Sequence, residues 1–138
     1  MTVLLDTNVL LDVLLARQPF VAESAKVYDA CDRGELTGFL CASSVTDLFY
    51  IIRKATQDPV RALALVKDLC QALSIAAVNQ AVIHEALEST LRDFEDAVAA
   101  ASGKAANVDA IVTRDPAGFQ GAAVPVHEPA EVVQICGL

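Results

Sequence analysis

The sequence predicts a three-layer α/β/α sandwich, in which helices cover both faces of a central, mainly parallel five-stranded sheet. Two observations predict this class: five short β-like runs are apolar almost throughout, and helical patterns fill most of the chain between them. Strands without polar alternation are typical of a parallel sheet buried on both faces, and long connections suit parallel crossovers. The 138 residues fit one domain over residues 1–138, and a hydrophobic content of 54% excludes a disordered chain.

The first half of the chain twice repeats a strand followed by two helices. Residues 2–5 form the first expected strand, before helices over residues 8–15, apolar on nearly every side, and 20–33, which Gly34 closes. Residues 38–42 form the second strand, and Asp58-Pro59 predicts the start of a helix over residues 60–73. Between these two elements Ser44 opens a helix whose apolar residues recur at i, i+3, i+4 and i+7: Val45, Leu48, Phe49 and Ile52.

The second half continues the alternation. The third strand is expected at residues 73–78, and Asn79 begins a helix that ends at Leu87. Asp93 begins the next helix, and its apolar stripe consists of Phe94, Ala97, Val98 and Ala101. The remaining elements are a strand over residues 110–113, a turn-rich surface loop over residues 116–121, a strand over residues 123–127 and a helix over residues 129–135.

The four cysteines favour a reducing compartment. Cys31, Cys41, Cys70 and Cys136 form no CxxC pair and lie within or beside apolar residues, so we expect buried, reduced thiols and a cytoplasmic protein. The N-terminus has no basic region, and Asp6 interrupts its apolar residues, so we expect no secretion signal. No run of about 18 uncharged apolar residues exists, so we expect no membrane span.

Carboxylates gather at the edge of the sheet where the parallel strands end. Asp6 follows the first strand, Asp47 lies in the opening of the helix after the second strand, and Asp115 follows the fourth strand. Asp93 and Asp96 open the helix before the fourth strand and could lean over the same edge. Ligand sites of open α/β sheets form at this edge.

Each acid also has a structural explanation. Asp6 and Asp93 could cap helices, and Ser44 with Asp47 matches a capping box. Asp115 could open a turn. Gathered at one edge, however, the acids would repel one another unless cations lie among them, since one like-charged pair a helical turn apart already costs roughly 0.2–0.5 kcal/mol. Oxygen-only ligands without His or Cys suit Mg²⁺ or Mn²⁺.

Three motifs carry a resemblance to a known family: LLDTNVLLD, then DFEDAVAAASGKAANVDAIVT, then TRDPAGF. With them the chain resembles, over essentially its whole length, a PIN domain. This metal-dependent ribonuclease fold includes the VapC-type toxins of toxin–antitoxin pairs. The resemblance implies that Asp6, Asp47, Asp96 and Asp115 are the catalytic acids and hold Mg²⁺ or Mn²⁺. It also implies a strand order of 3-2-1-4-5, in which the first and fourth strands are neighbours.

The resemblance further implies how the site works and what it acts on. Asn8 and Thr113 match positions that support the metal site, and Asp93 stands one turn before Asp96. The expected reaction is hydrolysis of an RNA phosphodiester by a metal-activated water, which leaves 5′-phosphate and 3′-hydroxyl ends. A cognate antitoxin is an expected partner. A homodimer is also expected, because the apolar helices over residues 8–15 and 60–73 exceed what one sheet can cover.

The net charge of -8 restricts how RNA could bind. It argues against a protein that binds nucleic acid through its overall field and favours a metal-gated site. Among only ten Lys and Arg residues, the candidates for RNA contacts are Arg53, Lys54 and Arg114. A preference for helix C-termini explains Arg53 and Lys54 equally well. Asp12, about a helical turn beyond Asp6, is expected to be a solvated or capping acid.

Two departures from the family pattern leave a second interpretation open. The first departure is Asp47, which stands where the family most often has Glu. The second is in the loop after the fourth strand, where relatives often have Asn followed by an acid just before Phe. Here Asp115 replaces that Asn, and Gly118 stands just before Phe119. The chain could therefore be a degenerate PIN-fold module that serves protein contacts without nuclease activity. A phosphatase of the haloacid dehalogenase type is a third interpretation, and Asn8, at the place of its second Asp, counts against it.

Overall fold

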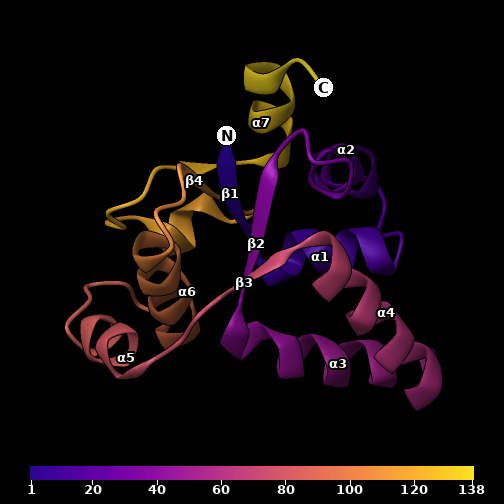
Figure 1. Cartoon of the computed structure of the whole chain (residues 1–138), viewed down its shortest axis with the longest axis horizontal. Coiled ribbons are helices and arrows are strands. Elements are labelled where there is room, and N and C mark those ends of the chain that lie inside the picture. Colours follow the sequence, from indigo (N-terminus) through magenta and orange to yellow (C-terminus); the bar gives the residue numbers. More distant parts are fainter.

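The computed structural model describes residues 1–138 and contains a five-stranded sheet with helices on both faces (Figure 1). The strands are β1 (Thr2–Leu5), β2 (Thr37–Cys41), β3 (Ser74–Ala76), β4 (Ala110–Val112) and β5 (Val126–His127). The helices are α1 (Thr7–Leu14), α2 (Val21–Asp32), α3 (Ala42–Thr56), α4 (Pro59–Ala72), α5 (Gln80–Leu87), α6 (Phe94–Ala105) and α7 (Pro129–Cys136), with a 3₁₀ helix, η1 (Pro116–Phe119), between β4 and β5.

The sheet has the order β3-β2-β1-β4-β5, as the resemblance implied, and all four strand pairs are parallel. β1 has the predicted bounds and β2 the predicted length, whereas β3, β4 and β5 are shorter than the apolar runs that predicted them. The fifth shows why: Pro125 has no N–H to donate to the ladder, so it only accepts a hydrogen bond from Ile111 N (2.8 Å), and β5 begins at Val126.

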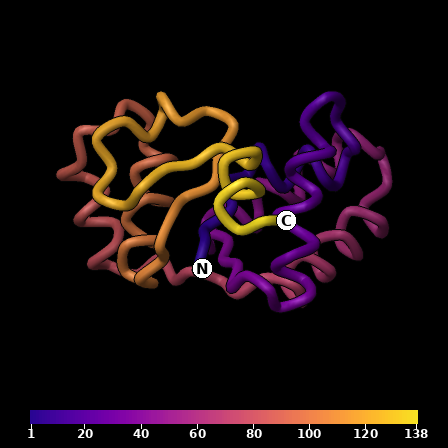
Figure 2. Tube along the Cα trace, turned by 90° about the horizontal axis from the view of Figure 1, so that it is seen from above, coloured from indigo at the N-terminus to yellow at the C-terminus, as the bar shows by residue number.

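Side chains of β1 alternate between two hydrophobic cores, one on each face of the sheet. Val3 and Leu5 pack in the core formed with α1, α2, α3, α4 and α7. Leu4 packs in the opposite core, which contains buried residues of α5 and α6 together with Phe119. Figure 2 shows the two groups of helices on opposite sides, with α5 and α6 on the left and α1 to α4 on the right. The predicted three-layer α/β/α architecture is therefore confirmed.

Helix boundaries follow the predicted caps at four places and depart from them at one. The N-caps of α1, α4, α5 and α6 each accept a backbone hydrogen bond and are Asp6, Asp58, Asn79 and Asp93. The helix expected to open at Ser44 instead begins at Ala42, directly after β2, with Cys41 at the N-cap. The capping-box interpretation of Ser44 and Asp47 is therefore wrong, since both residues lie inside α3.

The many small residues of α6 let this helix lie close to the sheet. Seven consecutive residues, from Ala97 to Gly103, are buried, so the buried surface is wider than the predicted stripe. A Cβ on Gly103 would lie 3.2 Å from a methyl group of Val108. Phe94, by contrast, was expected on the buried stripe but is 50% exposed, because it stands at the first position of the helix.

The thiols agree with the expectation in part. All four cysteines are free, and Cys31 and Cys41 are buried. Cys70 is exposed on α4, contrary to the prediction of burial, because apolar neighbours in a helix sequence need not share its face. None of the helices combines the length and the apolar character that crossing a bilayer would need.

The topology fixes where a site can form. β1 and β4 are adjacent and parallel, yet the chain leaves β1 toward α1 in one core and leaves β4 toward η1 and Phe119 in the other. The carboxyl ends of these two strands therefore flank a crevice, the topological switch point at which open α/β sheets bind ligands.

Candidate metal centre

Asp6 lies at the junction of β1 and β4. Its backbone N–H donates to Val112 O (2.9 Å), which extends the pairing of the two strands by one residue. As the N-cap of α1 it has an extended backbone, and its Oδ1 accepts from Thr7 N at 2.8 Å. The other oxygen, Oδ2, accepts from the Thr113 hydroxyl at 2.8 Å. Both carboxylate oxygens are thus held in place at the switch point.

Thr113, which is fully buried, joins the first helix to the loop after β4. Besides donating to Asp6, its hydroxyl oxygen accepts from Asn8 Nδ2 (3.2 Å) and from Asp115 N (3.0 Å). Asn8 Oδ1 in turn accepts from Arg114 N at 3.2 Å. Asn8 and Thr113 therefore hold the segments that carry Asp6 and Asp115 in a fixed relation.

Asp96 reaches the same place from α6. Asp93 caps this helix by accepting from Asp96 N at 3.0 Å, which fixes the first turn. Gly118 of η1 lies against both remaining carboxylates: a Cβ added to it would be 3.0 Å from Asp96 Oδ2 and 2.9 Å from Asp115 Oδ2. Because position 118 has no side chain, the space beside these two oxygens stays open.

The three acids influence one another electrostatically. Burial, followed by the charges of Asp6, Asp93 and Asp115, raises the pKa of Asp96 to about 6. Burial also raises the pKa of Asp6, against the opposing hydrogen bonds from Thr113 and Thr7, and the charge of Asp115 adds to the rise. No Lys, Arg or His forms an ion pair with Asp6, Asp96 or Asp115. The fold therefore concentrates negative charge that no side chain neutralises.

Asp47 stands apart from this group. It is exposed on α3, and its charge is not among the main causes of the raised pKa of Asp6 or Asp96. In the observed conformation, no three His, Cys, Asp or Glu side chains form a group that could hold a metal ion. Of the four predicted acids, the structure brings Asp6, Asp96 and Asp115 near one another and leaves Asp47 outside.

Divalent cations fit this place in chemistry and in room. The donors are carboxylate oxygens, which Mg²⁺ and Mn²⁺ prefer, and no sulfur or imidazole is present among them. The open space beside Asp96 and Asp115 is one that the single Cβ of an alanine at position 118 would fill.

The family model of the PIN domain matches residues 2–117, most of the chain. The chain belongs to the PIN domain family. No curated protein matches its sequence at a significant level.

Two solved structures share the fold of this PIN domain. VapBC2 from Rickettsia felis, bound to a DNA fragment from its promoter, has a TM-score of 0.72 at 14% sequence identity, covering 93% of this chain and 98% of that one. FitAB bound to an IR36 DNA fragment has a TM-score of 0.65 at 20% identity, covering 92% and 94%. At these identities the likeness to both structures establishes the fold alone.

Arg114 of this PIN domain is engaged in an internal contact. Its Nε donates to Asp12 Oδ2, and its guanidinium lies 3.9 Å from the centre of the Phe20 ring. Asp12 is completely buried, so its expected solvation is wrong. The signal was in the sequence: a helix that is apolar on nearly every side is itself buried, and an acid on it needs a buried partner. The predicted RNA contact of Arg114 would have to use the 27% of its side chain that stays exposed.

Arg53 and Lys54 lie in the last turn of α3 and form no ion pair. The Arg53 guanidinium is 6.0 Å from the ring centre of Tyr50, whose side chain is 61% exposed. Both cations are exposed to solvent, and an RNA contact for them stays a prediction.

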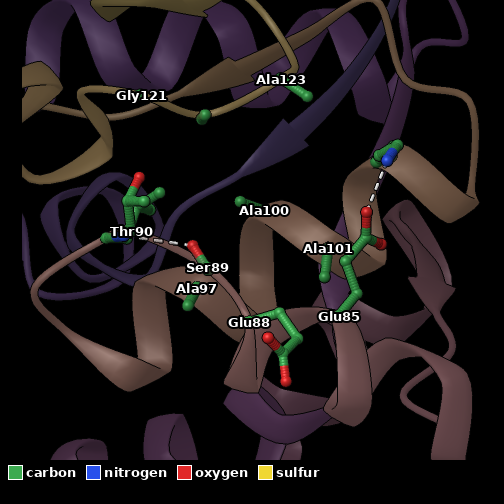
Figure 3. Close-up of a pocket in the computed structure, with 12 residues that line it drawn as sticks. Glu85, Glu88, Ser89, Thr90, Ala97, Ala100, Ala101, Gly121 and Ala123 are labelled. Carbon is green, nitrogen blue, oxygen red and sulfur yellow. Dashed lines mark hydrogen bonds and ion pairs between the residues drawn. The ribbon is translucent and has the colours of Figure 1, made fainter.

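Two hollows open near α6 in the PIN domain. A groove of about 500 Å³ contains Asp115 and Gly118 in its wall and so borders the carboxylates. A second hollow, of about 320 Å³, lies between α5, α6 and residues 121–123 (Figure 3). Small side chains of α6 and the Glu85–Lys104 ion pair line it, and none of the predicted site residues does.

Proposed function

We propose that this PIN domain is a metal-dependent endoribonuclease and the toxin of a toxin–antitoxin pair. One observation carries the proposal: Asp6, Asp96 and Asp115 meet at the β1/β4 switch point without a cationic partner, beside a space that Gly118 keeps open. Repulsion of this kind is tolerated where function requires it, and divalent cations relieve it.

Asp6, Asp96 and Asp115 would hold Mg²⁺ or Mn²⁺, with Asp47 assisting from α3. Such a bound ion lowers the pKa of a water and neutralises charge on a phosphodiester. Hydrolysis forms a bond between the water oxygen and phosphorus, breaks the bond from phosphorus to O3′, and leaves 5′-phosphate and 3′-hydroxyl ends.

The residues around the acids have positioning tasks. The Thr113 hydroxyl orients Asp6 Oδ2 and binds the backbone of Asp115. Asn8 holds the peptide of Arg114, and Asp93 fixes the turn that carries Asp96. These contacts keep the carboxylates in place before a metal ion or RNA arrives, which is the preorganisation that metal ligands require.

The test is cleavage of single-stranded and structured RNA in Mn²⁺. Asp6→Asn should abolish cleavage while the circular dichroism spectrum stays that of the wild type, and excess EDTA should abolish cleavage by the wild type. Asp68→Asn, which removes an exposed carboxylate on α4, is the matched control and should cut normally. Full activity of Asp6→Asn, or cleavage that EDTA does not affect, would contradict the proposal.

A second candidate function is a PIN-fold module for protein contacts without nuclease activity. The exposed position of Asp47 and the absence of a complete ligand group favour it. Metal binding separates the two candidates. A nuclease centre predicts that Mn²⁺ raises the melting temperature of the wild type and not of Asp6→Asn, whereas a degenerate centre predicts no effect on either.

The proposed partners are an antitoxin and a second copy of the chain. The antitoxin rests on the likeness to the VapBC2 and FitAB complexes. Helix α1 does not support the proposed homodimer, because its apolar residues are buried in the core of the same chain. The outer face of α4 supports it, because the apolar residues Val60 and Leu63 are 80% and 49% exposed there. Charged substitutions at these two residues should reduce the mass measured by light scattering from dimer to monomer.

A further inference from the structure

The groove beside the candidate metal centre is open to the carboxylates. Its wall consists of Thr90, Arg92, Asp115, Ala117, Gly118 and Gln120. Asp115 is one of the three carboxylates and also lines this wall. Gly118, which lines the wall too, lies against the carboxylates of Asp96 and Asp115. At about 500 Å³ the groove falls within the range of ligand sites, roughly 300–1,000 Å³. A ligand in it would lie next to a bond cleaved at the acids.

The wall of the groove is polar. Ala117 is its one apolar residue, and the others offer a hydroxyl, a guanidinium, an amide, a carboxylate and bare backbone. An apolar peptide or helix would leave these groups without hydrogen-bond partners, which costs binding energy. The groove therefore suits a ligand that is itself polar along its length.

Arg92 is a cation without an internal partner. Four of the ten Lys and Arg side chains are held in ion pairs with acids, whereas Arg92 is exposed and forms none, although Asp93 follows it in the chain. Its guanidinium is thus free to bind an anion that enters the groove. Arginine binds both carboxylate and phosphate with two parallel hydrogen bonds, and phosphate is the one that a substrate of the proposed nuclease carries.

Thr90 and Gln120 line the groove beside a tightly packed turn. Gly121, next to Gln120, has φ +97°, and a Cβ on it would lie 3.3 Å from Thr90 Oγ1. The turn thus packs directly against the Thr90 side chain, which also borders the hollow of Figure 3. Thr90 and Gln120 are both exposed, so their hydroxyl and amide can bind the 2′-hydroxyl that distinguishes RNA from DNA.

We infer that this groove binds the nucleotide next to the cleaved bond of a single-stranded RNA. Arg92 binds its phosphate, and Thr90 and Gln120 bind its ribose. The inference rests on the proposed ribonuclease function. It adds to that function the path of the RNA strand, which runs from the carboxylates into the groove.

The test compares Arg92→Ala and Arg92→Lys with a control, Arg61→Ala, which removes another exposed and unpaired arginine, on α4. In Mn²⁺, Arg92→Ala should raise KM about tenfold and leave kcat within about twofold, since a phosphate contact is lost outside the reacting atoms. Arg92→Lys should recover part of the loss, because it keeps the charge. Arg61→Ala should behave as the wild type.

A second measurement does not depend on cleavage. In EDTA and starting from low salt, where even limited electrostatic binding of RNA is strongest, the fluorescence anisotropy of a short labelled RNA should show about tenfold weaker binding to Arg92→Ala and a salt slope smaller by about 1. The DNA of the same sequence should bind more weakly than RNA to the wild type, and the double variant Thr90→Val/Gln120→Ala should lose this preference.

The outcomes separate the inference from the function on which it rests. If RNA is cleaved and Arg92→Ala matches Arg61→Ala in KM and in binding, the groove assignment is wrong while the nuclease stands. If no RNA is cleaved, the proposed function fails, and the anisotropy still decides the groove: dependence on Arg92 supports it. Binding that ignores Arg92, equal binding of DNA and RNA, or no measurable RNA binding overturns it.

Discussion

Replacing Asp96 by Asn should make the metal-free protein more stable, although it removes a proposed ligand. Burial and the charges of Asp6, Asp93 and Asp115 raise the pKa of Asp96 from 3.8 to about 6. At pH 7 the folded protein therefore carries a carboxylate that ionises less readily than in the unfolded chain. About two pH units correspond to about 3 kcal/mol at 1.36 kcal/mol per unit. Because the carboxyl is only half-buried, solvent screening reduces this to about 1 kcal/mol.

The sign of the effect depends on pH in a defined way. An acid whose pKa is raised by folding stabilises the folded state fully below its unfolded value, near 3.8, and this contribution is lost as the pH rises to about 6. The difference between Asp96→Asn and the wild type should thus be small at pH 4, grow between pH 4 and 6, and stay constant above. Asn keeps the backbone N–H that Asp93 caps, so the start of α6 is preserved.

Thermal unfolding in EDTA at pH 4, 5, 6 and 7 measures the effect. About 1 kcal/mol should raise the melting temperature of Asp96→Asn by roughly 3–5 °C at pH 7 for a chain of this length. Asp68→Asn is the control, because it removes an exposed acid from α4, on the opposite face of the sheet, and should change stability by less than about 0.5 kcal/mol. With Mn²⁺ added, the wild type should gain stability and Asp96→Asn should not. A variant less stable than the wild type in EDTA at pH 7, or a difference that does not change with pH, would refute the reasoning.

Two further substitutions test the surroundings of the centre. Gly118→Ala places a Cβ 2.9 Å from an oxygen of Asp115 and 3.0 Å from an oxygen of Asp96. It should therefore remove the Mn²⁺-dependent rise in melting temperature and change the melting temperature in EDTA little. An undiminished rise would mean that the ion binds elsewhere. Arg114→Met leaves the buried Asp12 carboxylate without its partner and should cost about 3 kcal/mol in urea denaturation, the lower end for a broken buried pair because Arg114 is partly exposed. A loss below about 1 kcal/mol would contradict the role of Arg114 as the partner that Asp12 requires.

The fold could be predicted because its determinants are local. Apolar runs identify buried strands, and the Asp58-Pro59 start of α4 and the Asp93 cap of α6 depend only on neighbouring residues. The predicted bounds of an element were wrong where a contact with a residue distant in the sequence determines the local structure. The predicted surface loop over residues 116–121 contains η1, in which Phe119 is 2% exposed because it enters the core beneath α6. No local pattern distinguishes this Phe from an exposed one.

The site could be predicted only as a set of acids at the ends of strands. Their meeting depends on the β1/β4 pairing, which the family resemblance supplied and which residue spacing alone leaves open. The Asp12–Arg114 pair joins positions 102 residues apart, and the exposure of Asp47 depends on which face of α3 packs against the core. Both follow from packing between elements, which a single sequence does not encode in its local patterns.

The acids of this chain divide into two kinds, and the division bears on function. Asp12 is buried and paired with Arg114, and Asp58 and Asp93 cap helices, so their charges have partners that folding alone explains. Asp96 and Asp115 have no such partner: they lie beside one another against Gly118, and folding raises the pKa of Asp96. A cluster that costs stability is retained where another requirement outweighs that cost. A bound divalent cation would turn the contribution of this cluster to folding stability from unfavourable to favourable. It would also offset part of the negative charge near the acids, so the net charge of -8 would weaken RNA binding without metal and would not exclude RNA as a substrate.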